Sequence, residues 1–172
     1  LYYQLPGKSL EICCMHLDKG QMWIGTTTDG AYRLQLDKNE LTHPILKGNI
    51  TSIYQDSEGE LWIGSWEEGL HHVKTDGTIE IFEYDAKNPY SISSNFVRAC
   101  CEDNLGNIWI GTFNGLNRYD KSTGLFQNHT ASDAQSDGLT HSSIWCIVKD
   151  NQGTLWLGTY FGGVNYFNPE YE

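Results

Sequence analysis

The sequence contains one pattern four times, and this repetition limits the folds open to the chain. In its clearest copy, residues 50–73, an apolar stretch is followed by an Asp, a Gly three residues later, the segment Leu-Trp-Ile-Gly-Ser, a short loop and a Gly-Leu pair. The other copies occupy residues 12–34, 97–119 and 144–167, and the tryptophans at the equivalent position of successive copies are 39, 47 and 47 residues apart. A repeat of this length is typical of an array of identical supersecondary units.

Within each copy, the residues predict a turn between two strands. An Asp at the head of a turn can accept hydrogen bonds from backbone amides, and a following Gly tolerates positive φ. The Trp offers a large apolar surface whose indole N–H needs an acceptor when buried. The Gly two residues after it would let a neighbouring strand or ring approach closely. The residues assigned to this structural repeat are Trp23, Trp62, Trp109, Trp156, Asp18, Asp56, Asp103, Asp150, Gly25, Gly64, Gly111 and Gly158.

The repeat predicts an all-β fold, because helical periodicity is nearly absent and each copy suits an antiparallel meander of three or four strands. One meander has two apolar faces and can bury both only by stacking on its neighbours, as the four-stranded blades of a β-propeller do. We expect either a small closed ring of four blades or part of a larger ring. The predicted blades are 9–48, 49–93, 94–142 and 143–172, the last without its fourth strand, and residues 1–8 are the last strand of a preceding blade that could pair with blade 4.

Charge and hydropathy exclude several classes of partner. The net charge of −11, from 11 basic and 22 acidic residues, disfavours nucleic acid, because such binding needs Lys and Arg to displace counterions from phosphates. The sequence has no run of 18 apolar residues and no leader, so we expect a soluble segment that meets a membrane only through other domains. No cofactor motif occurs in it.

The five cysteines fit neither a CxxC metal site nor a disulfide framework. Cys14 and Cys146 share one repeat position with Ser52 and Ala99, four residues before the Asp, and all four side chains are small. This column predicts small buried side chains, with cysteine acting as a compact hydrophobic residue. A disulfide stays possible in an oxidising compartment.

Three segments resemble a known repeat family: DSEGELWIGSWEEGL from residue 56, DNLGNIWIGTFNGLNRYD from residue 103 and DNQGTLWLGTYFGGVNYF from residue 150. They are similar to the two-component regulator propeller repeat, which builds sensor regions of bacterial hybrid histidine kinases, especially in Bacteroides-type organisms. The first copy departs from the pattern, with one residue fewer in its turn and Ala31 where the others have Leu or Val.

The resemblance implies about half of a seven-bladed sensor propeller, in the periplasmic part of an inner-membrane protein. Sensors of this family often respond to fragments of polysaccharides. Their membrane helix, histidine kinase, receiver and DNA-binding domains would belong to parts of a protein outside this sequence, so no enzymatic activity is expected of this segment.

One column of the repeat suggests a binding site. Four residues after each Trp stand Thr27, Trp66, Phe113 and Tyr160, in the loop between the second and third strands and on the propeller face where each first strand begins. Aromatic rings there would suit the C–H faces of sugars, with polar neighbours for the hydroxyls. The alternative is that these rings seal neighbouring blades or an interface with another propeller. The candidate ligand-binding residues are Trp66, Phe113, Tyr160, Trp145, Asn95 and Arg98.

Metal binding is disfavoured because the Asp column lacks the ligand density of a calcium loop and the histidines occupy non-equivalent positions. The leading hypothesis is a non-enzymatic, ligand-sensing propeller that detects oligosaccharides. Its rivals are a scaffold or dimerisation propeller and a polysaccharide hydrolase or lyase, for which Glu67 and Glu68 could supply carboxylates. If the blades were part of a larger ring, the outer two would expose apolar faces, so we also expect self-association into a homodimer.

Overall fold

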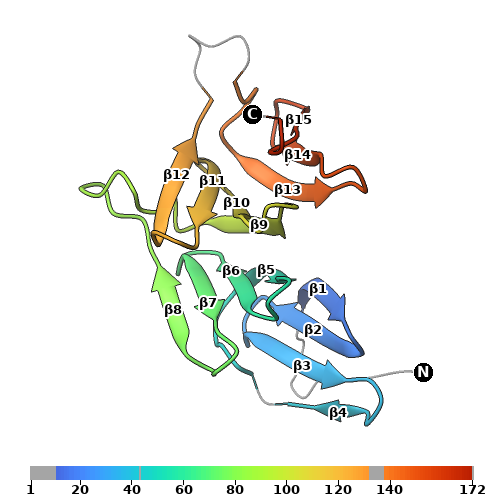
Figure 1. Ribbon diagram of the computed structural model, residues 1–172. Coiled ribbons are helices and arrows are strands. Elements are labelled where there is room, and N and C mark those ends of the chain that lie inside the picture. Colours follow the sequence, from blue (N-terminus) through green and yellow to red (C-terminus); the bar gives the residue numbers. More distant parts are fainter. Residues whose placement is uncertain (1–10, 43, 132–137, 172) are drawn as a thin grey trace.

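The computed structural model describes residues 11–42, 44–131 and 138–171, and all of its regular elements are strands (Figure 1). They pair antiparallel into sheets of four, four, four and three strands, each made of consecutive strands. The all-β propeller prediction is therefore confirmed. The strands are β1 Ile12–Asp18, β2 Gln21–Thr26, β3 Ala31–Gln35 and β4 Glu40–Leu41; β5 Ile50–Gln55, β6 Leu61–Ser65, β7 Leu70–Val73 and β8 Ile79–Phe82; β9 Val97–Glu102, β10 Ile108–Thr112, β11 Gly115–Asp120 and β12 Leu125–His129; and β13 Ile144–Lys149, β14 Leu155–Thr159 and β15 Val164–Phe167.

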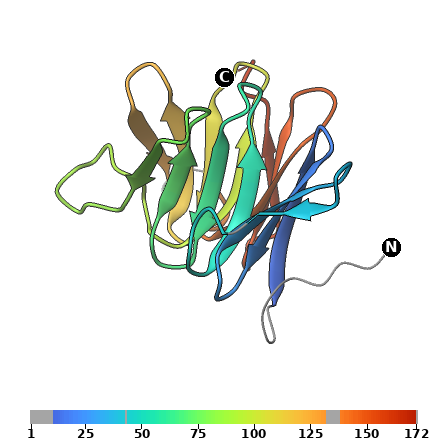
Figure 2. The same ribbon diagram turned by 90° about the horizontal axis from the view of Figure 1, so that it is seen from below.

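The four sheets are the blades of a β-propeller, numbered 1 to 4 along the chain. The first strands of successive blades pack on one another, β1 on β5, β5 on β9 and β9 on β13, and the later strands lie farther out (Figures 1 and 2). Between β1 and β13 the described chain shows no comparable packing. The predicted pairing of residues 1–4 with blade 4 lies outside the described residues, and the blade number of a larger ring stays a prediction.

The turn between the first two strands shows why Asp and Trp recur together. One oxygen of the Asp103 carboxylate accepts hydrogen bonds from the amides of Leu105 and Asn107, both at 2.9 Å. The other oxygen accepts the indole N–H of Trp109 at 2.7 Å. Blades 2 and 4 repeat this arrangement, with indole-to-carboxylate distances of 2.9 Å in both. The Asp therefore closes the turn and also satisfies the buried Trp.

Blade 1 departs from this pattern, in line with its shorter turn. Asp18 pairs directly with Gln21, and the two residues between them have φ values of 43° and 81°. Positive φ at both central positions is the mark of a tight two-residue hairpin turn. The indole N–H of Trp23 donates instead to Oε1 of Gln55 in blade 2, at 3.2 Å.

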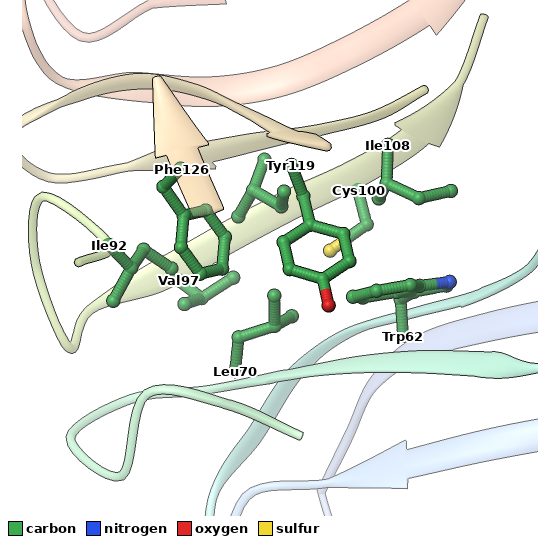
Figure 3. Close-up of a cluster of buried hydrophobic side chains, with 9 residues drawn as sticks. Trp62, Leu70, Ile92, Val97, Cys100, Ile108, Tyr119 and Phe126 are labelled. Carbon is green, nitrogen blue, oxygen red and sulfur yellow. The ribbon is translucent and has the colours of Figure 1, made fainter. Parts of the chain in front are cut away.

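In blades 1 to 3 the Trp packs against the next blade, which buries the sheets against one another. Trp62 and Trp109 are 0% and 4% exposed, whereas Trp156, which has no following blade among the described residues, is 42% exposed. Figure 3 shows the packing between blades 2 and 3. The buried residues there are Trp62, Leu70, Ile92, Val97, Cys100, Ile108, Ile110, Tyr119 and Phe126.

The glycine two residues after each Trp marks a close approach between strands. A Cβ on Gly64 would lie 2.4 Å from Oγ of Ser52 on β5 and 2.6 Å from Cγ1 of Val97 in the next blade. Both distances are well below normal contact, so any side chain at this position would push the blades apart.

The prediction of a uniformly buried column of small side chains is partly wrong. Ser52 and Ala99 are buried, but Cys14 is half-buried and Cys146 is exposed. Ser52 lies against Cys100 of the following blade, with Oγ and Sγ 3.9 Å apart. Cys146 lies on blade 4, which has no following blade among the described residues. It is therefore exposed although it occupies the same position of the repeat. All five cysteines are unpaired.

Candidate functional site

The aromatic column is fixed at one end of the propeller by its own backbone. In each blade, the amide of the residue four positions after the Trp donates to the carbonyl of the residue just before the first strand. The column therefore lies where the first strands begin, as the repeat predicts. The pairs are Thr27 with Glu11, Trp66 with Asn49, Phe113 with Phe96 and Tyr160 with Ser143, at 3.0 to 3.1 Å.

Two groups of rings meet at this end of the molecule. Trp66, Phe96 and Phe113 pack edge to face, with ring centroids 5.5 to 5.8 Å apart. Trp145 and Tyr160 of blade 4 stack at 5.1 Å with an interplanar angle of 16°. Together with Phe161, 4.1 Å from Tyr160, these rings form what we call the aromatic rim: Trp66, Phe96, Phe113, Trp145, Tyr160 and Phe161.

Arg98 on β9 joins the two groups of rings. Its guanidinium carbon lies 3.9 Å from the centroid of Trp145, 4.6 Å from Trp66 and 5.4 Å from Phe113. All three distances are within the range of cation–π attraction. Partial burial lowers the pKa of Arg98 below its ordinary value, but an arginine remains charged because that value is so high. Three blades thus contribute rings around one cation.

Five of the six predicted ligand-binding residues lie in one cluster, joined by ring–ring contacts and by contacts of the rings with the Arg98 guanidinium. The sixth, Asn95, has a structural role instead. Its side-chain oxygen accepts the amide of Tyr84 at 2.6 Å and so holds the chain after β8. Beside Trp66 there is a polar hollow of about 220 Å³. Its lining residues are Asn49, Ser65, Trp66, Glu67 and Glu68.

Sequence reasoning missed Phe96 and Phe161. Neither belongs to a repeat column of aromatics, because Asn49 and Ser143 occupy the position of Phe96 in other blades. Only their positions in the sequence could have indicated that they belong to the rim. Phe96 directly precedes the first strand of blade 3, and Phe161 directly follows the rim residue Tyr160. Phe161 is 79% exposed, and Tyr160 beside it is 51% exposed.

Other clusters do not form a comparable site. The carboxylates of Asp56, Glu58 and Glu60 converge closely enough to hold a metal ion. However, the ammonium of Lys121 lies 3.1 Å from Asp56 and 2.7 Å from Glu58, where its positive charge offsets part of theirs and occupies the space between them. Two further hollows, of about 510 and 210 Å³, lie on the outer side of blade 3 and between blades 3 and 4, away from the rim.

The repeated blades and the rim at the start of their first strands define this protein as a β-propeller built from identical units. The two-component regulator propeller family matches residues 44–67, 91–114 and 138–161. Each match contains the first strand, the turn and the second strand of one blade, in blades 2, 3 and 4. The chain therefore carries two-component regulator propeller repeats. The first copy, which departs in sequence and in its turn, lies outside these matches.

Solved structures share the fold at low sequence identity. The extracellular domains of two hybrid two-component systems from B. thetaiotaomicron match at 23% and 21% identity, with TM-scores of 0.55 and 0.53. These matches cover 98% and 95% of this chain but only 30% and 28% of the relatives. Virginiamycin B lyase from Staphylococcus aureus matches at 18% identity and a TM-score of 0.68, over 96% of this chain and 58% of the lyase.

The comparison with curated proteins found no match. The described residues also contain no helix long and apolar enough to cross a membrane.

Proposed function

We propose that this chain is the ligand-sensing part of an extracytoplasmic propeller in a hybrid two-component sensor, and that oligosaccharides bind at the aromatic rim. The repeat family and the shared fold of sensor extracellular domains support the assignment to a sensor. The observation that carries the binding site is the convergence of rings from three blades around Arg98. Sensing needs no catalytic group at the rim, and the kinase reaction of such a protein would be carried by its other domains.

The exposure of the rim suits a ligand of large, flat surfaces. Phe113, Trp145, Tyr160 and Phe161 are between 39% and 79% exposed, although such side chains are usually well covered in folded proteins. Sugar rings have apolar C–H faces that can cover aromatic rings, and Glu67 and Glu68 beside the hollow can accept hydrogen bonds from hydroxyl groups.

A ligand at the rim can change how the blades pack. Trp66, Phe113 and Trp145 come from three successive blades and meet at one guanidinium, so a ligand that touches all three is sensitive to the spacing of those blades. A ligand shifts an equilibrium only through different affinities for the two states. The proposed signal is therefore a preferred spacing of blades 2, 3 and 4 in the bound state.

Calorimetric titration with a panel of oligosaccharides tests the proposal. Replacing Tyr160 by Ala should weaken binding by about fivefold or more, because an aromatic contact contributes roughly 0.5–1.5 kcal/mol beyond area burial. Tyr90→Ala is the matched control, since Tyr90 is similarly exposed (57% against 51%) and lies outside the rim. Equal affinity of the two variants would show that the aromatic rim is not the binding site. Absence of binding to every glycan would favour a scaffold function.

The scaffold alternative is supported by exposed apolar side chains on the outer faces of blades 1 and 4. Blade 4 exposes Trp156 and Tyr166, and blade 1 exposes Met15 and Leu17, by 42% to 69%. Inside the chain, each Trp face packs on the first and second strands of the next blade. We propose that a second copy repeats this packing, blade 4 of each copy on blade 1 of the other, which closes a two-fold ring.

This self-association predicts a dimer in light scattering at tens of micromolar. Tyr166→Glu should shift the population to monomer, because it places a charge in the centre of the apolar contact, while Tyr90→Glu should leave the dimer intact. A monomer at these concentrations contradicts the pairing. Glu67 and Glu68 do not suit a glycosidase, since they are consecutive residues of one loop and a glycosidase needs carboxylates on two sides of a cleft.

A further inference from the structure

Arg98 is a cation that the described part of the chain leaves without a counter-charge. Lys74 and Lys121 pair with carboxylates at 2.6 to 3.1 Å, but no carboxylate of the described residues pairs with Arg98. Its Nε is buried and has no hydrogen-bond partner. A ligand from the solvent cannot reach this buried Nε, but a partly buried charge without a counter-charge is itself unfavourable, so an anion that reaches the rest of the guanidinium would be stabilised there.

The rings around Arg98 hold it but do not satisfy it. A ring attracts the charge of a guanidinium that lies over its face. The N–H donors of a guanidinium, however, lie in its plane and need acceptor oxygens, and a pair of parallel N–H groups matches a carboxylate. Trp66, Phe113 and Trp145 therefore fix the position of the two Nη groups, whose N–H donors have no hydrogen-bond partner among the described residues and remain available at the rim.

The same geometry makes a neutral sugar a poorer match than an anionic one. The guanidinium covers part of the ring surface on which a neutral sugar would stack, most closely at Trp145, where the distance is 3.9 Å. An oxyanion would use the donors that the rings leave unpaired. The net charge of −11 does not attract anions from a distance, so selection must come from this local contact.

We propose that Arg98 makes the rim selective for acidic oligosaccharides, with a carboxylate or sulfate group of the sugar bound to its guanidinium. This inference rests on the proposed function and names its ligand class. The acidic group lies on the Trp145 side of the rim, away from Glu67 and Glu68 beside Trp66, where like charges would repel it. The hydroxyl groups of the neighbouring sugar unit face those two carboxylates.

Calorimetry on the full chain tests this with matched probes. The probes are trimers of galacturonate and glucuronate, their carboxyl-reduced neutral homologues, and a sulfated neutral trimer. We expect an acidic trimer to bind roughly tenfold more tightly than its neutral homologue, as for one charge-assisted contact, and this ratio to fall with added salt. The uronate and sulfate arms show which oxyanion the site prefers.

Substitutions of Arg98 separate its role in binding from its role in packing. Arg98→Met should remove the preference for acidic trimers and leave binding of neutral ones within about twofold, because Met keeps an apolar chain between the rings. Arg98→Lys keeps the charge but not the planar fork, so it should retain only part of the preference. Arg33→Met is the control, since Arg33 lies over Trp23 in blade 1 at 5.8 Å and away from the rim.

The outcomes distinguish this inference from the proposed function. Equal binding of acidic and neutral trimers, or a preference that survives in a folded Arg98→Met variant, overturns the inference and leaves the sugar-binding rim intact. If that variant does not fold, the salt dependence and Arg98→Lys decide. Absence of binding by every probe to the unmodified chain overturns the proposed function and the inference together.

Discussion

The different burial of equivalent tryptophans offers a test of the propeller packing within one chain. Trp109 is 4% exposed and Trp156 is 42% exposed, and both indoles donate to the repeat Asp, at 2.7 and 2.9 Å. A buried aromatic side chain removes roughly 150–250 Å² from water, which at ~25 cal/mol per Å² corresponds to about 4–6 kcal/mol. Measured large-to-Ala changes at aromatic core positions are about 3–5 kcal/mol.

We therefore expect Trp109→Ala to reduce the free energy of unfolding by about 3–5 kcal/mol. Trp156→Ala should cost only about 2 kcal/mol, because the structure buries little more than half of that side chain. The hydrogen bond to the Asp is lost in both variants, so the difference between them reports the packing against the next blade. This packing is with Ile144, Leu155 and Leu157 of blade 4.

The assay is urea denaturation followed by circular dichroism, with the sample dilute enough that any dimer is dissociated. The midpoints report stability only if the free energy of unfolding has the same slope against urea concentration in all variants. A loss below about 1 kcal/mol for Trp109→Ala would mean that the tryptophan column lies on a surface. Equal losses for the two variants would refute the assignment of Trp156 to an uncovered face.

Further predictions concern the turn, the close approach and pH. Asp103→Asn should cost about 2–3 kcal/mol, because one amide oxygen cannot replace a carboxylate that accepts four hydrogen bonds, and thermal melts compare it with the unmodified chain. Gly64→Ala should cost about 1–3 kcal/mol by overpacking against Val97, and Val97→Ala in the same chain should relieve part of that strain if the contact is real. Burial lowers the pKa values of His16 and His71 below 6.5, so the folded state disfavours their protonation. Their contribution to stability is complete above pH 6.5 and is lost as the pH falls below it, which a series of urea midpoints from pH 7.5 to 5 should show as a decline, and a flat series would contradict.

Much of the candidate site followed from the repeat. The column four residues after each Trp places Trp66, Phe113 and Tyr160 at one end of the propeller because a repeated backbone geometry puts equivalent residues at equivalent places. Phe96 could not be found in this way, since it occurs in one blade alone. The structural use of Asn95 was also invisible, because its partner is a backbone amide that comes from the end of the preceding blade.

The sequence by itself determined the unit of this fold: turn chemistry and strand patterning act over a few residues, so the Asp, Gly and Trp of each copy specify a blade locally. The tertiary structure alone decided which of these identical signals are buried. Cys146 and Trp156 carry the same repeat positions as Ser52 and Trp62, yet they are exposed, because burial depends on a neighbouring blade. Contacts between blades join residues far apart in the sequence, as Arg98 with Trp66 and with Trp145, and only three-dimensional packing could surround Arg98 with rings from three blades.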